Sequence, residues 1–411
     1  MGSDRKTWKM EALTTLWTGD AQRKGARLVT TGLLGSIRWW FEVVVRGLSG
    51  SPCDPSHHPE NKPGPCPEST KRPDGPGHHC VVCELFGCTR WARKFRFDAL
   101  TSADKPHQDQ ITPGFFQLRF TPLRPICEEE WALLHLTLRL IAEYGAVGGR
   151  TVYKPSDELA LADAAVADFN DDLVLQRQVR GSPLNQNDRL LRVAGQAVTS
   201  LSEVEGSLSS RPTGGPVEIE VERNGTSTAL DGWFGKRHHQ DHGLIRIEHP
   251  PAVESVSRKR LEAYVADQRW RRVEHGDFAW ASLRNFWSID NKYLTRAGAK
   301  DCSFNVLLGR KEDKAIKERK GRRVIRWSDL FLSRNDDASR WLAGGRAESK
   351  KVFSFKDPES ARRTFGFVQS ADQLDEMRQR LREKAWDDLD DDEFATGGEI
   401  LHRLLGKGET G

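Results

Sequence analysis

The chain has 411 residues, of which 37% are hydrophobic and 30% are charged, and its formal net charge is +4. A chain of this length and apolar content can bury the cores of two or three domains, so a wholly disordered protein is excluded. No run of 18 apolar residues occurs, and no apolar core follows the charged start. We therefore expect no membrane span and no secretory signal, and a cytoplasmic location.

The small net charge conceals segments of opposite sign. Residues 258–326 hold 19 Lys and Arg against 9 Asp and Glu, whereas residues 155–205 hold 4 against 9. Six acids occupy the seven positions 387–393. The basic segment and the N-terminal third of the chain are therefore candidates for binding a polyanion.

The first third of the chain alternates strands with amphipathic helices. Residues 8–16 predict a strand, and residues 33–48 predict a helix with Thr31 as its N-cap. Residues 91–98 and 115–121 predict two antiparallel strands. A second helix, from Glu128 to Tyr144, has an acidic first turn. One further strand after the following glycine-rich turn would complete a ferredoxin-like βαββαβ unit.

The second half of the chain has weaker patterns. Residues 216–222 predict a strand, a helix is expected from about residue 257, and short strands are expected at 352–355 and 365–368. These elements suggest a second, degenerate unit of the same type. The acidic tail is expected to fray, although four aliphatic residues near its end could dock a short last helix: Ile400, Leu401, Leu404 and Leu405.

The expected fold class is α+β, with two ferredoxin-like (RRM-like) domains and a zinc-loop insertion in the first. The expected boundaries are 1–155 for the first domain with its insertion at 49–83, 156–215 for an acidic insertion or linker, 216–385 for the second domain and 386–411 for the acidic tail.

The cysteines are concentrated in one polar segment. Five of the seven lie within 36 residues, in or just after a stretch of Pro, Gly and His that cannot form a core: Cys53, Cys66, Cys80, Cys83 and Cys88. An odd number of cysteines without a secretory signal argues against a disulfide framework. The C-x-x-C spacing of Cys80 and Cys83 is that of a zinc knuckle, and Cys53 and Cys66 would complete four thiolates around a structural zinc ion.

Other interpretations of this segment remain open. The thiols could be reduced and without metal, or another side chain could replace one ligand: His57, His58, His78, His79 or Cys88. A catalytic zinc is disfavoured because it needs an open position beside an acid or base.

Two groups of residues mix arginine with aromatic rings. Trp40 continues the apolar stripe of the first helix and is expected in the core, whereas Arg38 and Trp39 lie off the stripe, with Arg46 further along. An indole and a guanidinium at the surface suit base stacking and phosphate pairing, and the alternative is an edge that packs on the insertion loop. Residues 90–97 also suit an RNA-facing strand, through Arg90, Arg93 and Lys94, or an ordinary edge strand with cationic gatekeepers.

The glycine-rich turn is the third candidate contact with RNA. Gly145, Gly148, Gly149 and Arg150 are followed by Lys154, which allows a close approach to a phosphate or forms a plain turn. His238, His239 and His242 are expected in a solvated loop because the metalloprotease glutamate is absent. Neither a Ser/His/Asp arrangement nor paired carboxylates stand out.

Three segments together resemble a known family: TGLLGSIRWWFEVVVRGL at 31–48, CELFGCTRWARKFRF at 83–97 and EYGAVGGRTVYK at 143–154. They resemble the first-subunit family of the Cmr-type (type III-B) CRISPR effector complex, which belongs to the RAMP superfamily. The matched motifs are Arg38-Trp39-Trp40, Phe86-Gly87 and the Gly145–Arg150 turn, although this turn lacks the full set of glycines in the family pattern. Cys88 stands where the family has a small residue, which favours the other four cysteines as ligands.

This resemblance implies two ferredoxin-like domains and a role in antiviral defence within a guide-RNA complex. It implies contacts with the CRISPR guide RNA near its 3′ end, with target RNA and with other RAMP subunits of the Cmr complex, without cleavage. One alternative is a metal-independent RAMP-type endoribonuclease that processes guide precursors with His239 or His275 as general base. The other is a scaffold whose zinc loop grips a neighbouring subunit.

Overall fold

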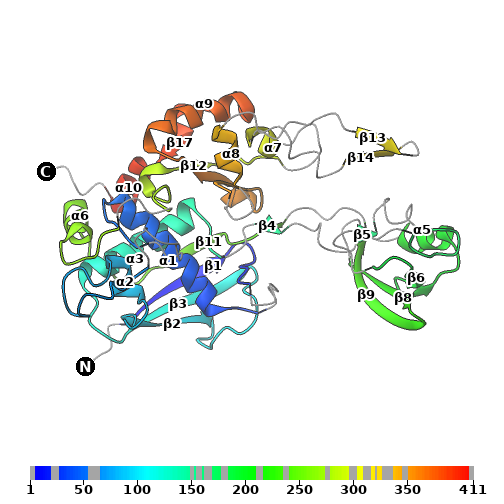
Figure 1. Cartoon of the computed structure of the whole chain (residues 1–411), viewed down its shortest axis with the longest axis horizontal. Coiled ribbons are helices and arrows are strands. Elements are labelled where there is room, and N and C mark those ends of the chain that lie inside the picture. The colour runs from blue at the N-terminus through cyan, green and yellow to red at the C-terminus, as the bar shows by residue number, and fades with distance from the viewer. Residues whose placement is uncertain are drawn as a thin grey trace. The chain divides into compact units, whose positions relative to one another are not determined.

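The chain folds as two compact units, shown in the computed structural model of Figure 1: Met1–Thr151 with Asp241–Gly411, and Val152–Gln240. The structure describes the following residues: 5–19, 27–53, 65–148, 152–153, 160–161, 169–176, 184–209, 216–234, 240–273, 278–295, 303–308, 316–319, 322–325, 337–344 and 350–406. The second unit is an insertion in the sequence of the first. No helix of the described residues is long and apolar enough to cross a membrane.

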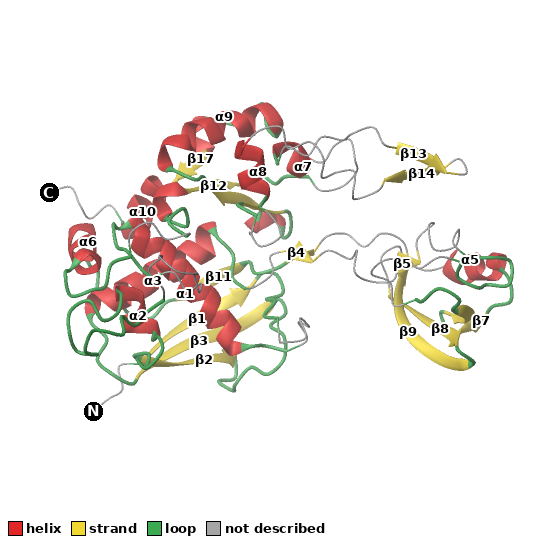
Figure 2. Cartoon of the chain, viewed as in Figure 1, coloured by secondary structure: helices red, strands yellow, loops and turns green. Residues whose placement is uncertain are grey.

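The first unit begins with a ferredoxin-like fold. Its elements are β1 (Lys6–Ala12), α1 (Thr30–Gly47), β2 (Phe95–Thr101), β3 (Gly114–Pro122), α3 (Glu128–Tyr144) and β11 (Ile245–His249). The four strands form an antiparallel sheet in the order β11-β1-β3-β2, and α1 and α3 provide the two crossovers (Figure 2). This βαββαβ order confirms the ferredoxin-like fold predicted for the first domain.

The strand that completes this sheet differs from the expected one. The sequence placed it directly after the glycine-rich turn, but β4 (Val152–Tyr153) pairs with β10 (Gln240–Asp241) where the chain passes between the units. The free edge of β1 is instead occupied by β11, with Met10 opposite Ile247 and Ala12 opposite Ile245. The first domain therefore does not end at residue 155, because its last strand returns after the whole second unit.

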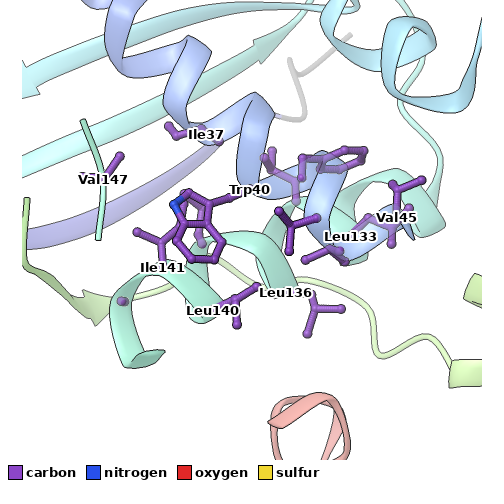
Figure 3. Packing of buried hydrophobic residues seen from close by; sticks show 14 of the residues in the cluster. Ile37, Trp40, Val45, Leu133, Leu136, Leu140, Ile141 and Val147 are labelled. Atoms are coloured by element: carbon purple, nitrogen blue, oxygen red, sulfur yellow. The ribbon is translucent and has the colours of Figure 1, made fainter. Parts of the chain in front are cut away.

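The helices α1 and α3 pack together over the sheet (Figure 3). Ile37, Trp40 and Val45 of α1 meet Leu133 and Ile141 of α3, and all five are buried. The helix α1 begins at Thr30 with Val29 as its N-cap, two residues earlier than the expected Thr31 cap, and no side chain caps it. The apolar spacing thus predicted the helix and its buried face, while tertiary packing set its start.

A second ferredoxin-like fold occupies the rest of the first unit. Its strands are β12 (Phe286–Asp290), β15 (Val352–Phe355), β16 (Arg363–Phe367) and β17 (Phe394–Thr396), in the antiparallel order β15-β16-β12-β17. Its helices are α7 (Ser303–Leu307), α8 (Asp337–Ala343), α9 (Leu374–Lys384) and α10 (Gly397–Leu405). When the four strands of each sheet are numbered in chain order, this sheet read from β17 and the first sheet read from β11 both have the order 4-1-3-2.

The boundaries of this second domain shift from those expected. It begins at β12 instead of residue 216, and it includes most of the tail from 386 onward. Residues 394–396 pair with β12, and Ile400, Leu401 and Leu404 are buried against the core, so the last helix docks. Burial of one apolar face outweighs the local charge of residues 387–393.

Residues of both ferredoxin-like folds form one shared hydrophobic cluster, and the second fold has a further cluster of its own around Trp287, Ile289 and Leu381. The Trp40 ring of α1 lies edge-on to Phe286 and Phe365 of the second sheet, with ring centroids 5.8 Å apart in both cases. The buried Arg363 of β16 donates from Nη1 to the carbonyl of Ala142, near the end of α3, at 2.9 Å. The two halves are therefore expected to unfold together.

The inserted unit has a core of its own. Its elements are β5 (Ala160–Leu161), β6 (Arg189–Val193), β7 (Gln196–Ala197), α5 (Leu201–Ser209), β8 (Pro216–Arg223) and β9 (Thr226–Phe234), with the sheet order β5-β9-β8-β6-β7. Val217, Ile219 and Val221 of β8 alternate into this core. The strand at 216–222 therefore exists but belongs to this unit, and residues 160–161, 189–193 and 196–197 of the supposed linker at 156–215 are strands of the same sheet.

The remaining elements flank these folds. They are α2 (Val81–Phe86), α6 (Arg258–Ala266), and the hairpin of β13 (Ile316–Arg319) with β14 (Arg322–Ile325). The predicted helix near residue 257 is α6, which Ser257 caps by accepting a hydrogen bond from the Arg260 amide at 3.3 Å.

Candidate metal centre and nucleic-acid surface

The short helix α2 positions two of the predicted metal ligands. Cys80 is its N-cap in extended conformation, and Cys83 lies one turn further on, so the C-x-x-C spacing turns both thiols toward one side. The helix ends at Gly87, whose φ of +81° places it where residues other than glycine are strained. A Cβ at Gly87 would lie 2.8 Å from the Arg93 amide nitrogen, which explains the glycine of the Phe86-Gly87 motif.

The structure brings the four predicted cysteines together. The Sγ atoms of Cys53, Cys66, Cys80 and Cys83 all lie within 4.8 Å of one another, and all four residues are buried. Those of Cys53 and Cys83 are 3.6 Å apart. Tetrahedral zinc–thiolate bonds of about 2.3 Å require sulfur separations of about 3.8 Å, so the donor set and its spacing fit a zinc ion.

The alternative ligands lie elsewhere or lie outside the described residues. Cys88 is half-buried and does not belong to the group of four. Nδ1 of His78 and Nδ1 of His79 share a hydrogen bond of 2.9 Å, and Nε2 of His79 bonds to Glu84 at 2.7 Å. His57 and His58 lie outside the described residues.

The four thiols perturb one another's protonation. Hydrogen bonding, chiefly with Cys66, lowers the pKa of Cys53, whereas hydrogen bonding, chiefly with Cys53, raises the pKa of Cys83. Complete ionisation needs a cation among the sulfur atoms, which is what a divalent metal supplies.

A buried ionic network next to the cysteines was not anticipated from the sequence. Glu84 of α2 accepts from the Trp91 indole at 3.0 Å and forms an ion pair with Lys94 at 2.7 Å. Burial raises the pKa of Glu84, but the hydrogen bonds from His79 and Lys94 outweigh burial and lower it to about 2. No sequence pattern links these residues, because the chain must turn back on itself to bring them together.

Three predicted RNA contacts face inward instead. The Arg38 guanidinium donates from Nη1 to the Gly87 carbonyl at 2.8 Å and from Nη2 to Cys83 Sγ at 3.2 Å. Arg46 donates to the Ala281 carbonyl at 3.2 Å. Lys94 is held between Glu84 and Glu130, with Nζ 2.8 Å from Glu130 Oε1. These three cations are satisfied within the fold, and Arg38 contacts Cys83 at the end of the 49–83 insertion and Gly87 just beyond it.

Three other predicted contacts remain available at the surface. Arg90 is exposed and Arg93 is half-buried, both in the turn between α2 and β2. Within the described part of the chain, no hydrogen bond or ion pair engages either guanidinium. Trp39 is half-buried, with its ring 5.0 Å from that of Trp40 and 5.6 Å from that of Phe367.

The glycine-rich turn is described only in part. Gly148 has a φ of +109°, and its amide donates to Ser36 Oγ at 2.9 Å, so that amide is already used within the fold. Gly149, Arg150 and Lys154 lie outside the described residues. So do His238, His239 and His275, while Nδ1 of the buried His242 bonds to the Thr15 carbonyl at 3.0 Å.

Comparisons with known proteins relate the first ferredoxin-like fold to one superfamily. A family model described as the RAMP superfamily matches residues 9–153. The curated proteins contain no match. Among solved structures, Cmr1 from Pyrococcus furiosus in its apo form matches with 13% sequence identity and a TM-score of 0.23, over 35% of this chain and 45% of that one. The match thus spans less than half of the length of Cmr1, and the similarity to the RAMP superfamily model is confined to residues 9–153.

Proposed function

We propose that the chain is a non-catalytic, RNA-binding subunit of a type III-B CRISPR ribonucleoprotein. In this role it contacts the 3′ region of the guide RNA or the guide–target duplex, and it docks on other RAMP subunits of the Cmr complex. The observation that carries the proposal is the RAMP match over residues 9–153, which covers all three motifs that resemble the first-subunit family.

The turn between α2 and β2 is the proposed contact with RNA. Arg90 and Arg93 follow the Phe86-Gly87 motif and have no ionic partner among the described residues. Guanidinium groups pair with phosphate oxygens in a planar, two-point geometry, and phosphate contacts supply most of the affinity of RNA-binding surfaces. Trp39 offers a ring for stacking on a base.

Fluorescence anisotropy with labelled single-stranded RNA tests this surface. The double variant Arg90→Glu/Arg93→Glu should weaken binding at least tenfold at 0.1 M salt. It should also reduce the slope of log Kd against log salt by about 1 to 1.5, since each lost phosphate contact contributes about 0.7. The matched control is Lys356→Glu/Lys384→Glu, which makes the same change in net charge at two exposed lysines of the second ferredoxin-like fold. Equal weakening by both pairs would contradict a localised site.

The cysteine cluster is proposed to bind a structural zinc ion. The support is the number, burial and mutual spacing of the four thiols. Inductively coupled plasma mass spectrometry of protein purified without chelator should find about one zinc per chain, and a Cys80→Ser/Cys83→Ser variant should lose it. Purified protein without zinc would contradict this part of the proposal.

The absence of catalysis is the remaining part of the proposal. Incubation of the purified chain with repeat-containing precursor RNA in EDTA should leave the RNA intact. Discrete cleavage that a His239→Ala or His275→Ala variant loses would instead establish the endoribonuclease alternative.

A further inference from the structure

Two arginines from distant parts of the chain converge on the cysteine cluster. Arg38 lies on α1, and its Nη2 donates to Cys83 Sγ at 3.2 Å. Arg271 follows α6, and its Nη1 donates to Cys66 Sγ at 3.7 Å. The two guanidiniums therefore reach two different sulfur atoms of the group of four.

Each arginine is held in place by further contacts. Arg38 Nη1 donates to the Gly87 carbonyl at 2.8 Å, and its Nε donates to Glu42 at 3.1 Å. The Arg271 side chain is only 11% exposed, its amide donates to the His79 carbonyl at 2.9 Å, and Nη2 lies 3.5 Å from Glu68. These contacts orient both guanidiniums toward sulfur without any need for metal to hold them.

Electrostatics gives the two arginines a role. Four thiolates around a divalent ion carry a net charge of −2, and burying an uncompensated charge of that size is costly. Two guanidiniums at the sulfur atoms offset it. The nearby carboxylates do not cancel this effect: Glu42 is shared with Arg46 at 3.8 Å, and Glu68 is 37% exposed and screened by water.

We propose that Arg38 and Arg271 are positioning residues of the metal centre, whose hydrogen bonds to Cys83 and Cys66 stabilise the metal-bound thiolates and tie α1 and the segment after α6 to the metal. This inference rests on the proposed function, in which the four cysteines bind zinc. It assigns Arg38 of the first motif to the metal centre instead of to RNA.

Metal affinity measured on the full chain tests the proposal. Zinc would be titrated against a chromophoric chelator, and cobalt(II) would report the ligand set through its sulfur-to-metal charge-transfer band. Arg38→Gln and Arg271→Gln should each raise the zinc Kd by about 10–100-fold, while the cobalt spectrum keeps its four-thiolate form. Arg38→Lys retains the charge and should lose less affinity. Arg269→Gln, next to Arg271 but exposed and stacked on Trp270 at 4.4 Å, is the matched control and should change the Kd less than twofold.

The outcomes separate this inference from the proposed function. If the wild-type chain binds neither zinc nor cobalt, this inference and the zinc part of the proposed function both fail, while the proposed RNA binding is still tested by the Arg90→Glu/Arg93→Glu variant. If it binds and Arg38→Gln and Arg271→Gln both stay within twofold of wild type, only this inference is overturned. Circular dichroism identifies any variant that fails to fold, and the other glutamine variant then decides the question alone. For Arg38→Gln, the slope of log Kd for RNA against log salt should equal that of wild type. A decrease of about 0.7 would show that Arg38 contacts an RNA phosphate.

Discussion

Replacement of Trp40 by alanine should destabilise both ferredoxin-like folds at once. The indole is 3% exposed, meets Phe286 and Phe365 across the boundary between the two folds, and donates from Nε1 to the Ala146 carbonyl at 2.8 Å. Truncation of a buried tryptophan costs about 3–5 kcal/mol. The carbonyl left without a donor adds about 1–3 kcal/mol, so we expect a total loss of about 4–8 kcal/mol.

Urea unfolding of the metal-loaded protein, followed by circular dichroism, measures this loss. Trp40→Phe keeps an aromatic ring but removes the donor, so it should lose about 1–2 kcal/mol. Trp386→Ala, at a half-buried tryptophan outside the shared core, should lose less than Trp40→Ala. A loss below about 1 kcal/mol for Trp40→Ala, or separate transitions for the two folds in the wild type, would refute the shared core.

Three further predictions concern single features of the fold. Gly87→Ala should lower the free energy of unfolding more than Gly77→Ala does. Both glycines have positive φ, but only at Gly87 would the new Cβ lie closer than 3.0 Å to backbone atoms. Urea titrations of the two variants measure the difference. Burial lowers the pKa of His135 to about 4, and its Nδ1 accepts from the Trp8 indole, so as pH falls the unfolded chain takes up the proton first. The free energy of unfolding should therefore fall by up to about 3 kcal/mol between pH 6.5 and 4, and a flat difference between wild type and His135→Gln over that range would contradict this. Replacing residues 152–240 by a short Gly-Ser linker should leave the melting temperature and zinc content of the remainder nearly unchanged, because that unit has its own core, and calorimetry with metal analysis would detect the opposite.

The candidate site could be predicted from the sequence where its geometry is local. The C-x-x-C spacing of Cys80 and Cys83 is converted by one helical turn into two adjacent thiols, and the polar loop before them had no other means of closing. The targets of Arg38 and Lys94 are not local. Their partners lie 49 and 36 residues away, at Gly87 and Glu130. A basic residue in the sequence carries no local sign of whether its side chain binds RNA or a distant part of the fold.

The sequence by itself determined the amphipathic helices, the first three strands and the cysteine set, because apolar periodicity and short spacings act within a few residues. Tertiary structure alone decided that β11 completes the first sheet after an 89-residue inserted unit, and that the acidic tail docks its last helix. The physical reason is that several distant segments can form hydrogen bonds with a free strand edge, and the segment that pairs is the one that also buries the most apolar surface. That competition involves the whole chain, so no local pattern records its result.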